Sequence, residues 1–222
     1  MATKRVGDQK LIRRILIGVV AVIAIFLIAA PLLAILSYAF AEGAGRYFDS
    51  LLTEDTLHAI KLSVITALIA VPINTLFGIA AAWAIAKFEF PGRRFLTAII
   101  ELPYSISPIV AGVAYLFVFG AQGLFGPFLQ ANDLKIMFAL PGIVLASLFV
   151  TAPFVARELI PLLETQGRER EEAGISLGAS GFQTFWRISL PGMRWALLYG
   201  IILCNARVFG EFGAVSIVSG NV

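Results

Sequence analysis

The chain has 222 residues, of which 59% are hydrophobic and 14% are charged, against about 45–50% and about 25% in ordinary soluble domains. That balance excludes a disordered chain, which needs low hydrophobicity and high charge, and the single cysteine, Cys204, excludes a disulfide framework. The net charge of +3 comes without the basic stripe that nucleic-acid binding requires. A protein embedded in the lipid bilayer is the class that remains.

Long apolar runs divide the chain, and about 20 such residues are enough for a helix to cross the hydrocarbon core of a bilayer. Most of these runs have no charge, one contains Glu101, and the last contains Arg207 and Glu211. The runs predict an all-α polytopic membrane protein, a single transmembrane domain over residues 1–222. Its expected spans are residues 15–38, 62–86, 95–119, 136–156 and 195–218.

The first run has a second interpretation, as a cleaved signal peptide, because basic residues precede it and Ala39-Phe40-Ala41 resembles a cleavage site. The apolar part of a signal peptide is about 7–15 residues long, whereas this run has about 24. Its length favours an uncleaved first span.

Lys and Arg in short loops are retained on the cytoplasmic side of a membrane. Thirteen basic residues fall before the first span and in alternate loops after it, and the other loops hold three, Arg46, Lys61 and Lys135. This asymmetry predicts a cytoplasmic N-terminus. The same count places the loop at residues 157–194 in the cytoplasm.

The cytoplasmic loop at residues 157–194 is much longer than the connections of a simple bundle, which commonly have about 2–8 residues. Its first half, residues 162–177, is rich in helix formers, and Gly178 is suited to end a helix there. Ser180 and Gln183 have the spacing of a capping box, which predicts a second short helix that ends near 190–192.

The two short helices are expected to form an elbow on the cytoplasmic surface. One interpretation is an amphipathic pair that rests on lipid headgroups. The small residues of the loop favour contact with another protein instead, because they let a backbone approach closely; they are Ala173, Gly174, Gly178 and Ala179.

The loop resembles the EAA loop of ABC-importer permeases. Glu172-Ala173-Gly174 is followed after three residues by Gly178 and after nine more by Ile188-Ser189-Leu190-Pro191, with Gly174 in place of an alanine. Further stretches make the chain most similar to the W-type permease of bacterial sulfate/thiosulfate importers, although the last of them also resembles molybdate permeases. These stretches are residues 152–161, 176–181, 204–207 and 210–215.

This resemblance implies the transmembrane domain of a type I ABC importer in a bacterial inner membrane, here ending before the last span of such permeases. The implied partners are two ATPase subunits, a second permease subunit and an extracytoplasmic sulfate-binding protein, and no cofactor is implied. The chain has no Gly-x-x-x-x-Gly-Lys-Ser/Thr phosphate loop, so it is not expected to be an enzyme. The residues implied in ATPase coupling are Glu172, Ala173, Gly174, Gly178, Ile188, Leu190 and Pro191.

Ionisable residues inside the membrane are costly and often functional. Arg207 and Glu211 lie four residues apart, so they are expected either to neutralise each other on one helix face or to line the path of the anion. For Glu101 a packing role and a functional role stay open. His58 is the only histidine, so we expect no metal site.

Other functions remain as alternatives. A molybdate or tungstate importer permease would share most of these features. An ion-coupled secondary transporter would use Glu101, Arg207 and Glu211 as a relay, but it leaves the long cytoplasmic loop without a role. An intramembrane enzyme is disfavoured because the sequence has neither Gly-x-Ser-x-Gly nor His-Glu-x-x-His.

Overall fold

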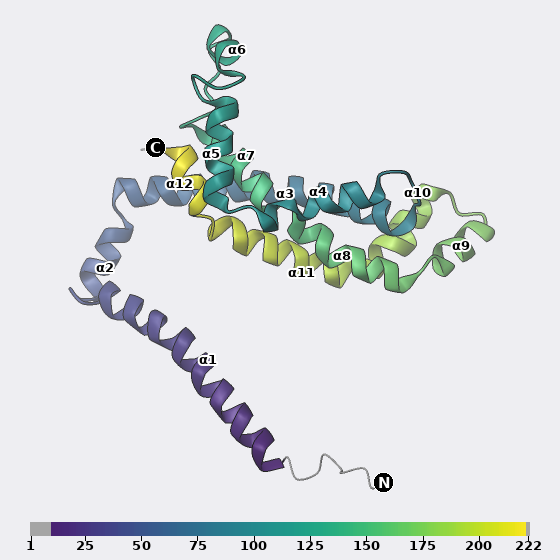
Figure 1. Ribbon diagram of the computed structural model, residues 1–222, viewed down its shortest axis with the longest axis horizontal. Helices are drawn as coiled ribbons and strands as arrows, with labels where there is room; N and C mark the ends of the chain where they lie inside the picture. Colours follow the sequence, from purple (N-terminus) through teal and green to yellow (C-terminus); the bar gives the residue numbers. More distant parts are fainter. Residues whose placement is uncertain (1–9, 221–222) are drawn as a thin grey trace, which may run out of the picture. The chain divides into compact units, whose positions relative to one another are not determined.

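A computed structural model describes residues 10–220 of the chain, and within that range every regular element is a helix (Figure 1). Lys4 and Arg5, which contribute to the orientation prediction, lie outside the described residues. The chain divides into two compact units, Met1–Ala59 and Ile60–Val222.

The first unit contains α1 (Lys10–Ala39), α2 (Ala44–Leu51) and the start of α3 (Glu54–Lys87). The side chains of α1 from residue 12 onwards are apolar almost throughout, most of them are exposed, and none is buried. An apolar helix with no buried face is suited to lipid on all sides. The predicted first span, 15–38, lies within this helix.

The second unit contains the rest of α3 and all the later helices. These are α4 (Arg93–Ser105), α5 (Pro108–Phe119), α6 (Gly126–Ala131), α7 (Leu140–Thr151), α8 (Pro153–Gln166), α9 (Glu169–Ser176), α10 (Gly181–Thr184), the π-helical turn η2 (Phe185–Ser189), α11 (Leu190–Phe209) and α12 (Gly213–Ser219). In Figure 1, α8 and α11 run side by side for most of their length.

Small residues bring α3, α8 and α11 into close contact. A Cβ atom added at Gly78 of α3 would lie 2.6 Å from Cβ of Val155 in α8, and one added at Gly200 of α11 would lie 3.1 Å from Cα of the same valine. Close approach at small residues is the usual way in which helices associate in lipid. The core formed by these helices includes Ala82, Leu159, Leu163 and Met193.

A second core is formed by α7 and α12, with α5 packed against it. Its buried residues are Met137, Ala146, Val150, Ala214 and Val218. The second unit therefore contains more than one packed core, and the core of α3, α8 and α11 extends to Phe185 in η2.

The segment expected to cross the membrane at residues 95–119 is two helices, α4 and α5, that meet at 108°. Ile106 and Ser107 between them have extended backbone angles. Pro108 explains the break, because the residue before a proline is driven out of the helical region. The segment expected at residues 195–218 is likewise divided, into α11 and α12 with a bend of 49°.

The helix that follows residue 140 is longer than the predicted fourth span, 136–156. It begins at Leu140 and, with a break at Ala152, continues to Gln166, so the start of the expected loop is helical. The prediction of one helix over residues 162–177 is wrong, because the chain turns at Gly167, whose φ is +63°. Glycine adopts such an angle without the strain that other residues suffer.

By length and composition, three helices in the described part of the chain are able to cross a membrane. If each of the two bent helix pairs counts as one crossing, the number of possible crossings rises to five. The three are Ile12–Ala39, Glu54–Lys87 and Leu140–Gln166. The apolar helices identify a multi-pass membrane protein.

Candidate functional site

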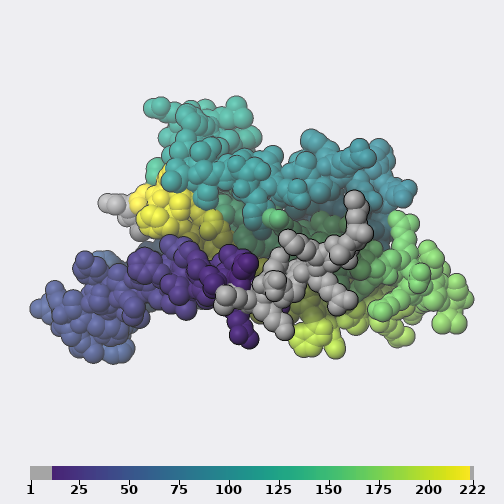
Figure 2. All heavy atoms as spheres, turned by 60° about the horizontal axis from the view of Figure 1, so that its bottom comes forward, coloured from purple at the N-terminus to yellow at the C-terminus, as the bar shows by residue number. Residues whose placement is uncertain are grey.

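The candidate site is the helical segment that joins α8 to α11, which we name the elbow: α9, the turn at residues 177–180, α10 and η2. In Figure 1 it lies at one end of the second unit, away from α5 and α12. Figure 2 shows the same region, coloured green, at the outer edge of that unit. The elbow is therefore placed to contact another molecule.

The turn of the elbow is closed by Gly178, as the sequence predicts. Its φ is +88°, its N–H donates to the carbonyl of Ile175 at 2.9 Å, and the N–H of Ala179 donates to the carbonyl of Gly174 at 3.0 Å. These two bonds are those of a Schellman motif, which requires a left-handed residue at this position. A side chain at Gly178 would meet no atom within 4 Å, so the requirement is for the backbone angle alone.

The second arm of the elbow begins at the predicted capping box. The N–H of Gln183 donates to the Ser180 hydroxyl, and the Gln183 amide oxygen accepts from the N–H of Ser180 at 3.0 Å. Both bonds satisfy donors that a helix N-terminus leaves unpaired. The direction of this arm is thus fixed locally.

The prediction that this arm ends near residues 190–192 is wrong. The N–H of Leu190 donates to the carbonyl of Phe185, five residues back, and the helix continues as α11. Pro191 is tolerated because it lies in the first turn of α11, after a widened π-helical turn. The elbow therefore leads directly into α11.

The motif residues face in two directions. Glu172, Ala173 and Gly178 are exposed, whereas Gly174 is buried beneath the other arm. A Cβ atom at Gly174 would lie 2.5 Å from Cδ1 of Ile188. Gly174 and Ile188 thus hold the two arms together.

The end of the motif joins the elbow to the core. Leu190 is half-buried and packs against the core cluster of α3, α8 and α11, while Pro191 is exposed. The outward residues remain available to a partner, and the inward ones shape the elbow.

A buried lysine joins the elbow to α3. Lys87, the last residue of α3, is 7% exposed; its Nζ donates to the carbonyl of Gly167 and lies 3.0 Å from Oε1 of Glu171 in α9. The Ser189 hydroxyl donates to the same carboxylate oxygen at 3.0 Å. Four segments of the chain therefore meet at one ammonium group and one carboxylate, which we name the Lys87 cluster.

Sequence reasoning missed this cluster and treated Lys87 only as one of the charges that indicate orientation. Nothing in the sequence separates it from Arg93 or Arg94, which follow closely. The ion pair of Lys87 is formed with a partner 84 residues later, Glu171, which only the fold brings near.

Glu171 is held in its charged form. Partial burial raises the pKa of its carboxyl, but hydrogen bonds from Lys87, the backbone and Ser189, together with the Lys87 charge, outweigh burial and leave the pKa below its ordinary value. The cluster is therefore an ion pair at neutral pH.

Two further contacts join the helices that flank the elbow. Gln166 at the end of α8 donates from Nε2 to the carbonyl of Gly192 in α11 at 3.0 Å. Arg93 at the start of α4 lies 2.6 Å from Glu164 of α8. The Lys87 cluster thus joins the elbow to α3, and these two contacts join α8, which leads into the elbow, to α11 and α4.

The free face of the elbow is apolar at its tip. Leu177 in the turn is 90% exposed and Phe182 in the second arm is 73% exposed, with Ile175 and Trp186 beside them in sequence and also exposed. An exposed group of large apolar side chains is typical of a contact with protein or lipid.

Comparison with known families decides the class of protein. Residues 74–222 match the family described as binding-protein-dependent transport system inner membrane component, and the match includes the whole elbow. The chain belongs to this family. It is therefore a membrane permease of ABC transporters, a family whose members are not catalytic themselves.

The permease is similar to several curated proteins along most of its length. It is 49% identical over 207 residues to the sulfate transport system permease protein CysW of Escherichia coli K12, covering 93% of this chain and 71% of that protein. It is 47% identical over 215 residues to CysW of Synechococcus elongatus, covering 97% and 75%. It is 44% identical over 211 residues to Sulfate permease 2, chloroplastic, of Chlamydomonas reinhardtii, covering 95% and 57%.

The intramembrane charges of the permease form an ion pair. Nη2 of Arg207 lies 2.8 Å from Oε2 of Glu211, and Oε1 of Glu211 accepts from the N–H of Ala214 at 3.0 Å. The prediction that the two neutralise each other is confirmed, but the prediction that they share one helix face is wrong, because α11 ends at Phe209 and Glu211 lies in the bend before α12. The carboxylate is buried, and the guanidinium is partly exposed.

The remaining candidate residues of the permease lie apart from this pair. Glu101 is exposed on α4 and lines a shallow cleft of about 170 Å³ together with Arg157, whose guanidinium carbon lies 4.7 Å from the ring centre of Tyr104. His58 is exposed in α3. Among the described residues, no three His, Cys, Asp or Glu side chains are grouped as a metal would need.

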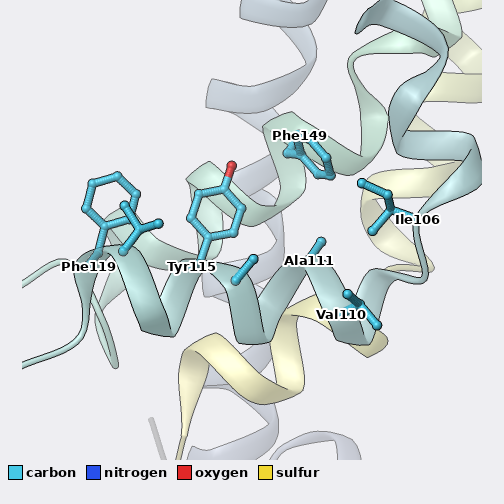
Figure 3. Close-up of a pocket in the computed structure, with 8 residues that line it drawn as sticks. Ile106, Val110, Ala111, Tyr115, Phe119 and Phe149 are labelled. Atoms are coloured by element: carbon cyan, nitrogen blue, oxygen red, sulfur yellow. The ribbon is translucent and has the colours of Figure 1, made fainter. Parts of the chain in front are cut away.

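An apolar cavity of about 310 Å³ lies between α5 and α7 of the permease (Figure 3). Phe119, Tyr115 and Ala111 of α5 line it together with Phe149 of α7, and the Tyr115 hydroxyl donates to the carbonyl of Leu145 at 3.3 Å. Its lining has no cationic side chain, so it is unsuited to an oxyanion.

Proposed function

We propose that this chain is one permease subunit of an ATP-driven importer for sulfate and thiosulfate, and that the elbow couples it to a separate ATPase subunit. The relatives named as sulfate transport permeases, at 49% and 47% identity, support the choice of anion. The elbow's geometry supports the coupling role.

One observation carries this proposal: the elbow is exposed at its tip and joined to the transmembrane helices at its base. Leu177 at the tip is available to a partner. At the base, the Lys87 cluster joins the elbow to α3, and the bond from Gln166 to Gly192 joins the two helices, α8 and α11, between which the elbow lies in the chain. A segment so connected moves as a rigid body and passes its displacement to the spans.

In this proposal Glu172 and Ala173 contact the ATPase directly, and Gly178 sets the backbone angle of the turn between the arms. The side chains of Glu172 and Ala173 are exposed on the first arm. The inward residues Gly174 and Ile188 hold the arms together, and Leu190 and Pro191 begin the helix that carries the displacement into the membrane.

The complete transporter would contain two ATPase subunits, this permease, a second permease and an extracytoplasmic sulfate-binding protein. It would lie in the inner membrane of a bacterium with the N-terminus of this chain and the elbow in the cytoplasm, as the distribution of basic residues favours. ATP hydrolysis would come from the partner, because this sequence has no phosphate-binding loop.

The intramembrane pair is our candidate for the anion path. The guanidinium of Arg207 is partly exposed although Glu211 is buried. A cation that is already satisfied by one carboxylate attracts a passing anion only weakly, which favours release as well as entry. Arg207 would therefore guide the anion, with Glu211 as the residue that positions it.

Sulfate uptake tests the choice of anion. In a bacterial strain that lacks its own permease of this kind, the full transporter containing this chain is expected to restore ATP-dependent uptake of radiolabelled sulfate and not of molybdate. Restoration of molybdate uptake alone would identify the alternative anion. Sulfate uptake driven by an ion gradient without an ATPase subunit would contradict the ABC assignment.

Replacement of Gly178 with leucine is expected to uncouple the elbow. A left-handed backbone costs a residue with a side chain about 1–2 kcal/mol, which lowers the population of the native turn about tenfold. We expect normal membrane insertion but a large loss of sulfate uptake and of co-purified ATPase.

Gly178→Asn is the matched control, because asparagine tolerates left-handed angles and is expected to keep most of the uptake. Uptake by Gly178→Leu at the wild-type rate would count against the coupling role of the turn.

A further inference from the structure

Three transmembrane helices meet at a group of buried polar side chains that neither the fold nor the elbow explains. The Asn74 amide in α3 donates from Nδ2 to the hydroxyl of Thr151 in α7 at 2.7 Å and to the carbonyl of Leu148 at 3.2 Å. Cys204 of α11 lies with Sγ 3.9 Å from the carbonyl of Thr151. Asn74 is 3% exposed, and Thr151 and Cys204 are fully buried.

These contacts lie at the break between α7 and α8. Pro153 has no N–H, so the carbonyl of Phe149 lacks its usual helical donor. The N–H of Ala152 donates to the carbonyl of Phe149 instead, at 3.4 Å. In a regular helix that N–H would bond the carbonyl of Leu148, so this carbonyl is left without its helical donor. Asn74 provides the missing donor, because its amide bonds the carbonyl that the break releases.

The hydroxyl of Thr151 strengthens the same arrangement. It accepts from Asn74 and donates to the carbonyl of Ser147, one turn back in α7, at 2.6 Å. A threonine that bonds the carbonyl four residues back tends to bend its helix. The side chains of Asn74 and Thr151 therefore both stabilise α7 in the broken form.

The break lies inside one apolar helical segment, Leu140–Gln166, and its two sides have different neighbours. On the N-terminal side, α7 packs against α5 and α12. On the C-terminal side, α8 packs against α11 through Gly200 and leads to the elbow. A tilt of α8 relative to α7 has its pivot at residues 151–153, next to Asn74.

We infer that Asn74 is a positioning residue that holds the joint between α7 and α8 in one of two states. In the state seen here its amide bonds the carbonyl of Leu148. When the elbow moves α8, the N–H of Ala152 returns to that carbonyl and Asn74 is released. Hydrogen bonds between helices in lipid are individually weak, which allows a nucleotide-driven displacement to break this one. This inference rests on the proposed coupling role of the elbow.

The test measures the joint directly and needs no anion. Spin labels are attached to cysteines at Lys135 and Thr165, which are exposed before α7 and on α8. Cys204 is buried and stays unlabelled. The distance distribution between the labels is measured by pulsed electron resonance in the complete transporter, made with cysteine-free partners, in the presence and absence of ATP.

The wild-type transporter is expected to show one distance without nucleotide and a second with ATP. Asn74→Leu, which keeps the volume but removes the donor, is expected to raise the second population without nucleotide about three- to tenfold. A single wild-type-like distance in Asn74→Leu would overturn the inference.

The control is Thr75→Val at the neighbouring position, because the Thr75 hydroxyl bonds only the carbonyl of Val71 in its own helix. It is expected to match the wild type, and a shift equal to that of Asn74→Leu would overturn the inference. If Asn74→Leu does not fold, Thr151→Val is measured in the same way: it removes the hydroxyl that accepts from Asn74 and bonds the carbonyl of Ser147, so it is expected to shift the distances in the same direction, and no shift would overturn the inference.

The outcome also separates this inference from the proposed function. If the wild type shows the ATP-driven change but transports no sulfate, only the choice of anion fails. If the wild type shows no change with ATP while sulfate transport is normal, the joint does not move, and the inference is wrong although the function stands.

Discussion

The Lys87→Met variant is expected to lose sulfate transport while its transmembrane helices still insert. The substitution removes the ammonium that bonds the carbonyl of Gly167 and the carboxylate of Glu171. Breaking a buried ion pair by removal of one partner costs about 3 kcal/mol or more, because the remaining charge is left without compensation. Such a cost lowers the population of the anchored elbow about hundredfold.

The measurement for Lys87→Met compares sulfate uptake, membrane content and co-purified ATPase with those of Lys61→Met. Lys61 lies in the same helix but is exposed, so its replacement is expected to change none of them. A double variant, Lys87→Met with Glu171→Leu, is expected to be no worse than Lys87→Met alone, because the isolated carboxylate is then gone. Equal transport by Lys87→Met and the wild type would show that the elbow needs no anchor to α3.

Replacement of Gly78 with leucine is expected to destabilise the second unit. A Cβ atom at this position would lie 2.6 Å from Cβ of Val155 and 3.0 Å from the backbone nitrogen of Ala156. Neither atom is the far end of a flexible side chain, so α3 and α8 must separate. Overpacking of this kind costs about 1–3 kcal/mol and lowers the melting temperature by about 2–12 °C.

Thermal unfolding of the purified permease in detergent measures this effect. Gly18→Leu is the matched control, because Gly18 is also inside an apolar helix but a Cβ there meets no atom within 4 Å. An unchanged melting temperature in Gly78→Leu would show that α3 and α8 are not packed as closely as the structure has them.

Features that depend on neighbouring residues were predicted correctly from the sequence. The left-handed turn at Gly178 and the capping box of Ser180 and Gln183 are both present, because each is decided by a few adjacent side chains and backbone bonds. The apolar runs were found for a similar reason, since lipid requires long uncharged helices.

Features that depend on distant partners were missed. Lys87 pairs with Glu171, and Asn74 pairs with Thr151, and no local pattern connects the members of either pair. The continuation of the second arm into α11 was missed because a proline such as Pro191 usually ends a helix. Here the π-helical turn before Pro191 lets the helix continue past it. Pro108 behaves differently, because α4 ends before it and α5 begins at it.

The π-helical turn at Phe185–Ser189 has a consequence for the spacing of the motif. A wide turn takes one residue more than an α-helical turn, and one residue rotates a helix by about 100°. Deletion of a single residue there would therefore turn α11 about its own axis relative to the two arms and carry Arg207 away from its present direction. The nine residues between Gly178 and Ile188 consequently set an angle as well as a length, and natural insertions or deletions in this interval are expected to be rare.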